Sequence, residues 1–220
     1  MRLDLHIHST FSRDGTATPG EIVQRCRQLG LDGFAIADHN EIKGSLEAVS
    51  YSRDLGLLAV RAVEISTNEG HILSYGVSEL VPKGLSIRET IDRVHALGGI
   101  AVAAHPVRFP SGIGLEATEH HRFDAIEVLN GGNSRRSNGR AGRLAERSGK
   151  PVTAGSDAHR IDEIGKSYVE MDVASSEDDI ISSISRGRAR VGGRSRTYSE
   201  GVVYSVETLV AWLRGSLKRL

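Results

Sequence analysis

Short apolar runs alternate with amphipathic segments along almost the whole chain, and this alternation constrains the fold more than any other feature. Each apolar run has the length of one buried strand, and each amphipathic segment has the apolar spacing of a helix. Repeated strand–helix units with short connections are typical of a parallel sheet, open or closed. The expected strands cover residues 3–8, 33–38, 57–65, 71–77, 100–104, 125–129, 152–154, 168–173 and 202–206, and the expected helices cover 19–30, 46–55, 87–97, 134–148, 177–186 and 207–217.

The bulk properties of the sequence exclude several classes of protein. The 220 residues fit one domain of ordinary size, and the 28 basic residues balance the 28 acidic ones, so no net charge favours a nucleic-acid or membrane partner. The single cysteine excludes an internal disulfide and suits a reducing compartment. No apolar run reaches the ~20 residues of a membrane helix. We therefore expect a single cytoplasmic domain over residues 1–220.

The first expected strand carries two histidines on one face. Successive side chains of a strand point to opposite faces, so Asp4, His6 and His8 should share a face while the apolar residues between them enter the core. Two histidines two positions apart lie roughly 7 Å apart at Cα, close enough to hold one metal ion. Asp157 and His159 repeat this spacing near the other end of the chain, and we expect the fold to bring both pairs together around metal.

Metal-capable side chains also end most of the other expected strands. His39 follows the second strand, Glu64 ends the third, and His105 ends the strand over 100–104. In parallel β/α barrels the functional residues gather at the C-terminal ends of the strands. His71 begins its strand, but a tight turn at 68–70 predicts a hairpin that returns His71 to the side of Glu64. All these segments can therefore place side chains at the same end of the barrel, which is its mouth.

The types of candidate ligand limit the metals that such a site would hold. Imidazole and carboxylate groups without cysteine favour zinc, manganese or iron over calcium or a thiolate site. The candidates outnumber the three or four ligands that one zinc ion uses, so two or three divalent ions are expected, with Glu64 as a bridge. Clustered ions ~3.5–4 Å apart are a common device for in-line displacement at phosphorus. A single structural zinc would need far fewer ligands.

Six short motifs stand in order at these positions. They are Asp4-Leu5-His6-Ile7-His8-Ser9, Ser12-Arg13-Asp14-Gly15, Ala37-Asp38-His39, Val63-Glu64-Ile65, Ala104-His105-Pro106 and Gly155-Ser156-Asp157-Ala158-His159. Together they resemble the ordered motifs of the PHP (polymerase and histidinol phosphatase) family over residues 2–173. The resemblance implies an α/β fold, a distorted seven-stranded (β/α)7 barrel, with a trinuclear metal site that hydrolyses phosphoesters. Arg13 lengthens the usual Ser-Asp-Gly loop by one residue.

The resemblance also implies a distribution of ligands among three ions. His6, His8, Glu64 and Asp157 would hold the first ion, Glu64 would bridge to a second completed by His71 and His105, and Asp14, His39 and His159 would hold the third. Asp4 and Asp38 are expected to orient the ligating histidines instead of binding metal.

A phosphate substrate also needs cationic or N–H donors that the protein supplies itself. Arg135 and Arg136 begin the helix after the strand that ends at Asn130, and a guanidinium can grip a phosphate with two hydrogen bonds. Arg108, just after the His-Pro pair, is a comparable candidate, as is Asn130. We therefore expect these four residues to contact substrate.

The sequence offers no protein nucleophile, because no Ser or Cys has a base motif around it. A metal-activated water is the expected nucleophile, and Asp157 or His159 is expected to assist proton transfer as a catalytic residue. The expected activity is that of a metal-dependent phosphoric ester hydrolase acting on a nucleotide or the end of a short oligonucleotide. The close spacing of the motifs leaves no room for a large substrate domain, and an aromatic content of 5% offers few stacking platforms, so duplex nucleic acid and long single strands are not expected partners.

Three alternatives stay open at this point. Histidinol-phosphate phosphatase is the alternative phosphatase, although family members of that type usually run longer. An amide hydrolase on a related histidine-rich barrel is a second enzyme class, and a catalytically inactive structural PHP domain is the non-enzyme alternative, whose signature would be missing ligands. The sequence leaves the exact substrate, the metal identity and the oligomeric state open.

The remaining residues carry weaker expectations. His95 should lie on a helix surface, and His120 and His121 in a solvated loop. Residues 186–220 are expected to form a C-terminal extension packed on the barrel, in which residues 192–196 are either a basic loop near the mouth or a surface turn. The apolar stripe of the helix over 207–217 should pack on the barrel or on a second subunit.

Overall fold

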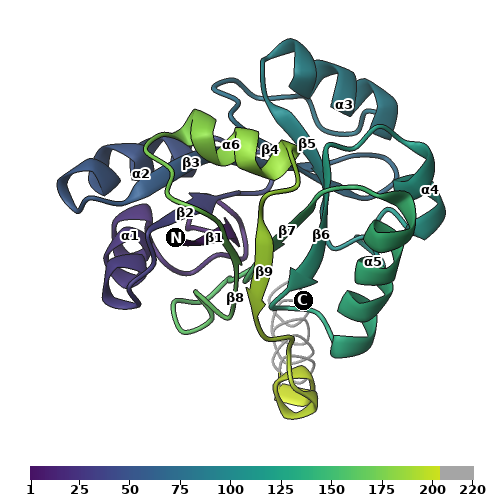
Figure 1. Ribbon diagram of the computed structural model, residues 1–220. Helices are drawn as coiled ribbons and strands as arrows, with labels where there is room; N and C mark the ends of the chain where they lie inside the picture. The colour runs from purple at the N-terminus through teal and green to yellow at the C-terminus, as the bar shows by residue number, and fades with distance from the viewer. Residues whose placement is uncertain (204–220) are drawn as a thin grey trace, which may run out of the picture.

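The computed structural model of the protein describes residues 1–203, and they form one mixed sheet wrapped by helices (Figure 1). The sheet order is β7-β6-β5-β4-β3-β2-β1-β8-β9. Its strands are β1 (Arg2–Ile7), β2 (Gly33–Ile36), β3 (Leu58–Ser66), β4 (His71–Tyr75), β5 (Ile100–Ala103), β6 (Ala125–Asn130), β7 (Val152–Gly155), β8 (Ser167–Glu170) and β9 (Arg190–Gly193).

The sheet curls until its first and seventh strands nearly meet, which makes a barrel. The backbone N–H of His8 donates to the carbonyl of Ala158 over 2.8 Å, and that of Asp157 donates to the carbonyl of His6 over 2.7 Å. A Cβ on Gly155 would lie 2.3 Å from the Cβ of His6, so only glycine permits this approach. This closure places the ends of β1 and β7 side by side.

The expected barrel type is confirmed, but the strand count differs from the expected seven. Strands β1 to β3 are parallel, as are β5 to β7, whereas β4 runs antiparallel to both of its neighbours. Strands β8 and β9 add an antiparallel ribbon beyond β1, which brings the described strands to nine. The antiparallel β3–β4 pair is the hairpin that the tight turn predicts.

Helices cover the outside of the barrel, with α1 and α2 on one side, α3 to α5 on the other and α6 across one end (Figure 1). They are α1 (Pro19–Gln28), α2 (Lys43–Asp54), α3 (Ile87–Ala96), α4 (Leu115–His120), α5 (Arg135–Ser148) and α6 (Glu177–Ser185). Thr18 and Ser86 begin α1 and α3 with capping boxes, which explains why these helix starts were readable from the sequence. None of the helices within residues 1–203 combines the length and apolar character needed to cross a membrane.

The apolar face of β1 departs from simple alternation. Its pairing with β2 shifts register between Asp4 and Ile7. As a result Leu3 and Leu5 pack in the largest apolar cluster, together with Tyr75 of β4, whereas Ile7 packs in a different cluster beneath α1. The irregularity therefore changes which face the strand buries on either side of His6.

Three local expectations were wrong. Residues 115–120 form α4, so His120 ends a helix instead of lying in a loop. Residues 190–193 form β9, paired with β8, so the start of the basic segment belongs to the sheet. Residues 202 and 203 are helical instead of beginning a strand, and the rest of that strand and the helix over 207–217 lie outside the described residues.

Candidate metal centre

The structure brings all nine expected ligands to one end of the barrel. Three groups have ligand atoms that lie within 4.8 Å of one another: His6, His8, Glu64 and Asp157; His39, Glu64 and His71; and His8, His39 and His159. His105 and Asp14 join these groups through Glu64 and His159, at 2.8 and 3.2 Å. The strand ends and the barrel closure produce this convergence, and the role of each residue as a metal ligand stays a prediction.

The first group is fully enclosed. His6 and His8 are at most 1% exposed, and Glu64 and Asp157 at most 4%. The Nε2 atoms of His6 and His8 lie 3.2 Å apart, and each is 3.3 Å from Oε2 of Glu64. If both imidazoles were protonated, two N–H groups would face one another. A cation shared by these nitrogens and carboxylates removes that conflict, so the donor set fits a metal ion.

Glu64 spans two parts of the site with its two oxygens. Oε2 faces His6 and His8, whereas Oε1 lies 2.9 Å from Nδ1 of His71 and 2.8 Å from Nε2 of His105. The β3–β4 hairpin produces this geometry, because it pairs Ser66 with His71 and returns the imidazole to the carboxylate. The arrangement is the one a bridging carboxylate requires.

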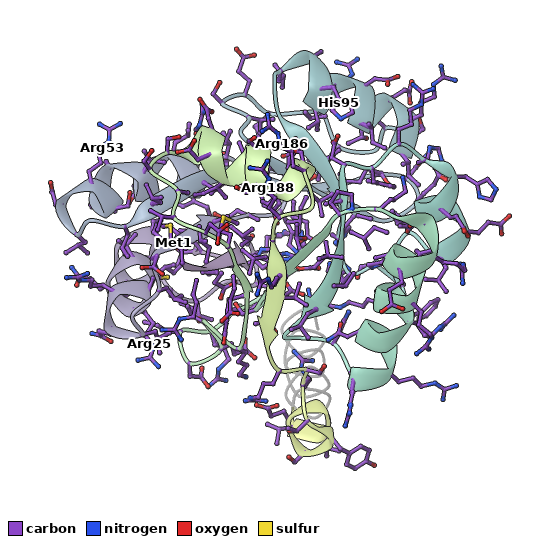
Figure 2. The ribbon with its side chains drawn as sticks, in the orientation of Figure 1. Met1, Arg25, Arg53, His95, Arg186 and Arg188 are labelled. Carbon is purple, nitrogen blue, oxygen red and sulfur yellow. The ribbon has the colours of Figure 1, made fainter. Side chains whose placement is uncertain are left out.

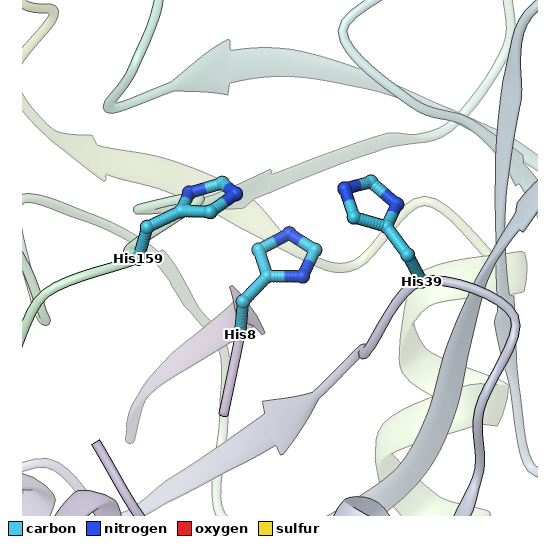
Figure 3. A group of neighbouring side chains, drawn as sticks. All are labelled: His8, His39 and His159. Atoms are coloured by element: carbon cyan, nitrogen blue, oxygen red, sulfur yellow. The ribbon is translucent and has the colours of Figure 1, made fainter. Parts of the chain in front are cut away.

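The third group lies nearer to solvent. Figure 3 shows the rings of His8, His39 and His159 converging from three separate segments. Their centroids lie 4.6 Å apart for His8 and His39 and 4.3 Å apart for His8 and His159. Asp14 approaches His159 at 3.2 Å and His39 at 3.8 Å, and its side chain is 51% exposed. His8 therefore contacts both the enclosed group and the outer one.

His39 adds a second indication that cations belong here. Its Nδ1 lies 3.2 Å from Oε2 of Glu64, yet this buried nitrogen makes no hydrogen bond within residues 1–203. Burial lowers the pKa of His39 to about 4, so its imidazole is neutral at pH 7. A neutral ring nitrogen beside a carboxylate oxygen, without a hydrogen bond between them, is what two ligands of a common ion would present.

The enclosed groups have strongly displaced pKa values. Burial alone would raise the pKa of Glu64, but His6 and its other imidazole partners hold it well below the usual range. Burial likewise opposes ionisation of Asp157, and the Arg108 guanidinium together with His6 overcomes it. Burial would lower the pKa of His8, whereas its hydrogen bonds with Asp157 and Glu64 raise it to about 9. The pocket therefore keeps carboxylates ionised and requires positive charge near them.

A buried carboxylate that the sequence analysis missed organises the inner wall. Oε1 of Glu127, on β6, lies 2.9 Å from Nδ1 of His6, and Oε2 accepts from the backbone N–H of His105 over 2.8 Å. Carboxylates in this position fix the orientation and raise the basicity of a ligating histidine. In the sequence, this role is indicated only by a single glutamate within the apolar run over residues 125–129.

The two aspartates expected to orient histidines bind backbone and hydroxyl groups instead. Asp4 accepts from the backbone N–H groups of Ser156 and Gly165, both over 2.8 Å. Asp38 accepts from the N–H and the hydroxyl of Ser9, both over 2.6 Å. These bonds tie the loops after β1 and β7 in place, so both aspartates act on the loops and not on the imidazoles.

Backbone conformation is unusual at the same positions. Within residues 1–203 the non-glycine residues with positive φ are Asn40, His105 and Asp157, at 54°, 27° and 53°. Such conformations are sparsely populated by L-residues and collect at functional sites. Two of the three are expected ligands, and the third follows His39.

A cavity of about 670 Å³ opens beside the histidines. Arg108 lines it, and its guanidinium pairs with Asp157 while Nε and Nη2 donate to Asn133 and Asn130 over 2.8 and 2.7 Å. Asn130 is fully buried, with its amide bonded to Glu127 and Asp157 as well, so it positions other groups and does not line the cavity.

The other two expected substrate contacts lie beside this cavity. Arg135 and Arg136 line a neighbouring hollow instead.

Figure 2 places His95 on α3, at the periphery, where its Nε2 lies 2.7 Å from Asp124. The same figure places Arg186 and Arg188 beside α6, before β9 begins, whereas Arg196 follows β9 and lines both hollows.

Comparison with known proteins decides the family. A sequence model of the PHP domain matches residues 4–99, and a model of a PHP-associated region matches residues 135–189. An uncharacterised protein of Methanocaldococcus jannaschii is 36% identical over 116 residues, which cover 48% of this chain and 68% of that protein. The chain belongs to the PHP family. The prediction made from the six motifs is confirmed.

Two further relatives carry descriptions. A 3′,5′-nucleoside bisphosphate phosphatase of Chromobacterium violaceum is 33% identical over 111 residues, 46% of this chain and 39% of that enzyme. A two-domain protein of Bacteroides vulgatus, described as containing a predicted PHP-like metal-dependent phosphoesterase, has the same fold, with a TM-score of 0.73 and 17% identity over 88% of this chain and 65% of that one. The chain thus spans about two fifths of the named enzyme and just under two thirds of the solved chain. The expected class of phosphoester hydrolase agrees with both descriptions.

Proposed function

We propose that this PHP-family protein is a metal-dependent phosphoesterase that hydrolyses a phosphate ester of a nucleotide or of a short oligonucleotide end. The observation that supports this most is the Glu64 carboxylate, buried among five imidazoles, whose two oxygens face two ligand groups beside a cavity. A structural metal site would not need an open cavity next to a bridging carboxylate.

The residues present fit two or three divalent ions, with manganese, zinc and iron as the candidates. The first would be held by His6, His8, Glu64 and Asp157, the second by Glu64, His71 and His105, and the third by Asp14, His39 and His159. When bound, such ions lower the pKa of a water molecule and offset negative charge on phosphoryl oxygens.

Arg108 is the protein's own group for holding the phosphate. Asn130 and Asn133 accept from two of its nitrogens, which fixes the plane of the guanidinium at the cavity wall. Its present partner is Asp157, so a phosphate oxygen can share the positive charge without a rearrangement of the loop. A fixed guanidinium of this kind orients a phosphate and stabilises charge that builds up on its oxygens.

Between the two expected proton-transfer residues, His159 is the better placed. Asp157 is enclosed, and Arg108 and His6 hold its pKa well below the usual range, so it would rarely carry a proton. In His159, Nδ1 lies 2.9 Å from the carbonyl of Asp157, which favours a proton on Nδ1, while Nε2 lies 3.2 Å from Oδ2 of Asp14 at the cavity wall. The Nε2 atom can bind an ion or accept a proton, not both, so His159 would protonate the leaving group only in a two-ion form of the site.

The size of the cavity supports the proposed substrate class. A volume of about 670 Å³ suits a nucleotide-sized molecule. The name of the Chromobacterium violaceum relative, a nucleoside bisphosphate phosphatase, supports a nucleotide substrate.

The deciding experiment is a panel of substrates on purified protein loaded with manganese, zinc or iron. We expect turnover of p-nitrophenyl phosphate and of nucleotides, slower turnover of histidinol phosphate, and none of cyclic amides. His8→Ala should lose activity and bound metal together, as measured by kinetics and elemental analysis, whereas His95→Ala on α3 should change neither. An unchanged metal content and activity in His8→Ala would contradict the proposal.

A further inference from the structure

A second hollow of about 660 Å³ lies next to the metal-centre cavity. Its described walls come from the start of α5, with Arg135 and Arg136, and from the segment after β9, with Arg196, Tyr198 and Val202. Figure 1 shows both segments at the lower end of the molecule, where β6 and β9 finish. The hollow therefore stands beside the mouth of the barrel and not on a remote face.

The two hollows adjoin at a shared wall. Ser134 and Arg196 line both of them, and these residues form an isolated parallel bridge. The backbone N–H of Arg196 donates to the carbonyl of Asn133 over 2.8 Å, and the side chain of Asn138 donates to Ser195 over 3.0 Å. A molecule that reaches over this wall from the metal centre would enter the second hollow.

The segment that carries Tyr198 is held in place by charge and by a helix cap. Thr197 and Glu200 form reciprocal capping bonds at 2.8 and 3.3 Å. Arg194 donates to both oxygens of Glu200 over 2.7 and 2.8 Å, and Lys166 lies 3.3 Å from the same carboxylate. These contacts leave the Tyr198 side chain 90% exposed at the hollow, although its backbone is fixed.

The chemistry of the hollow combines an aromatic face with unpaired positive charge. Arg135 and Arg136 are exposed, and neither has an ion-pair partner within residues 1–203. An exposed aromatic ring beside guanidinium groups is the combination with which proteins bind a base and its phosphate in single-stranded nucleic acid. An aromatic ring stacks on any base, and a guanidinium binds a phosphate with two hydrogen bonds.

We propose that the second hollow binds the nucleotide that adjoins the reacting phosphate, with its base against Tyr198 and its own phosphate between Arg135 and Arg136. This inference rests on the proposed phosphoesterase function and narrows its substrate class to a short single-stranded oligonucleotide of at least two nucleotides. Two adjoining hollows of similar volume fit two nucleotide units, whereas a mononucleotide would fill only the first.

A binding measurement tests the subsite without turnover. Calorimetric titration of the full chain in EDTA with the 5′-phosphorylated dinucleotide pTpT and with the mononucleotide pT should show the dinucleotide binding at least tenfold more tightly. The pair Arg135→Ala/Arg136→Ala, and separately Tyr198→Ala, should remove most of that difference, while Tyr198→Phe should retain it. Arg140→Ala is the matched control, because Arg140 is also an exposed arginine of α5 and does not line either hollow.

A kinetic measurement separates this inference from the proposed function. The ratio of kcat/KM for pTpT to that for pT should exceed ten in the native protein and approach one in the double arginine variant. Equal affinities and equal kcat/KM values for the two substrates would overturn the subsite while leaving the phosphoesterase intact, as would an equal loss in Arg140→Ala. Tight, arginine-dependent binding of pTpT without hydrolysis of any phosphate ester would support the subsite and contradict the proposed function.

Discussion

The inner wall and the outer rim of the candidate metal centre use the same residue types in opposite environments. The inner wall, defined as His6, His8, Glu64, Glu127 and Asp157, is at most 4% exposed. The outer rim, defined as Asp14, His39, His159 and residues 194–200, lies beyond the strand ends and reaches solvent, with the Asp14 side chain 51% exposed. Enclosed charges must be matched in place, whereas exposed charges can be matched by water and salt. Substitutions in the inner wall should therefore have large effects that resist salt, and those in the rim smaller ones.

Glu64→Gln should give the largest effect. It keeps the shape of the side chain but removes the charge that faces His6 and His8 on one oxygen and His71 and His105 on the other. We expect loss of bound metal and a fall in kcat/KM of roughly 10³-fold or more, equivalent to about 4 kcal/mol of transition-state stabilisation. Elemental analysis and kinetics measure both, with the exposed Glu79→Gln as the control. Retention of the native metal content would show that the inner wall is not the metal site.

Glu127→Gln should rank second, because Glu127 acts through His6 and the backbone of His105. Removing this kind of supporting carboxylate weakens metal affinity by roughly 10–100-fold. The expected signature is a raised dissociation constant for manganese in a calorimetric titration, with near-native kcat once metal is saturating. The control is Glu146→Gln, on the exposed face of α5. If Glu127→Gln binds manganese with the native dissociation constant, the role of Glu127 is purely structural.

Glu64 and Glu127 also show which parts of the site can be predicted from the sequence and which cannot. Glu64 was predictable, because it ends a strand within a recognisable motif and its hairpin follows a readable turn. Glu127 was not, because its importance depends on the barrel closing so that β6 faces β1, a contact between residues 121 positions apart. For the same reason the sequence identified Asp4 and Asp38 as important but misassigned their partners, and it placed Arg135 and Arg136 at the mouth without separating the two hollows.

The helices and strands also differ in how well the sequence predicts them. Local signals, such as the capping boxes at Thr18 and Ser86, located helices within a few residues. Strand β9 was missed because it has only four residues, two of them glycine, and exists through its pairing with β8. Alternation along β1 failed for a related reason, since its register shift depends on the neighbouring strand. Features set by local chemistry were thus readable, and features set by tertiary pairing were not.

Asp14→Asn tests the rim and should have a smaller effect than either inner-wall variant. Asp14 contacts His159 and His39 only at 3.2 and 3.8 Å, and half of its side chain faces water. We expect the bound metal to fall by one ion per chain while the enclosed ions stay, with a fall in kcat/KM of about tenfold, which corresponds to about 1.4 kcal/mol. Quantitative elemental analysis of the preparation used for the kinetics measures how many ions the variant has lost. Loss of all bound metal would mean that rim and inner wall form one inseparable cluster.

Glu200→Gln should have the smallest effect, and it tests whether the rim behaves as ordinary surface charge. The Arg194 guanidinium, followed by the cap bonds of Thr197, lowers the pKa of Glu200. A carboxylate whose pKa falls on folding stabilises the protein above its unfolded pKa of about 4.3, and this contribution is lost as the pH falls toward the folded value.

At neutral pH the variant should therefore unfold with a free energy lower by about 1 kcal/mol or less, since exposed ion pairs contribute little. The difference should shrink as the pH falls below about 4 and as salt is added. Urea unfolding of both proteins across this range measures it. A loss of several kcal/mol that salt does not reduce would place Glu200 with the enclosed charges of the inner wall, and the division between the two regions would fail at this point.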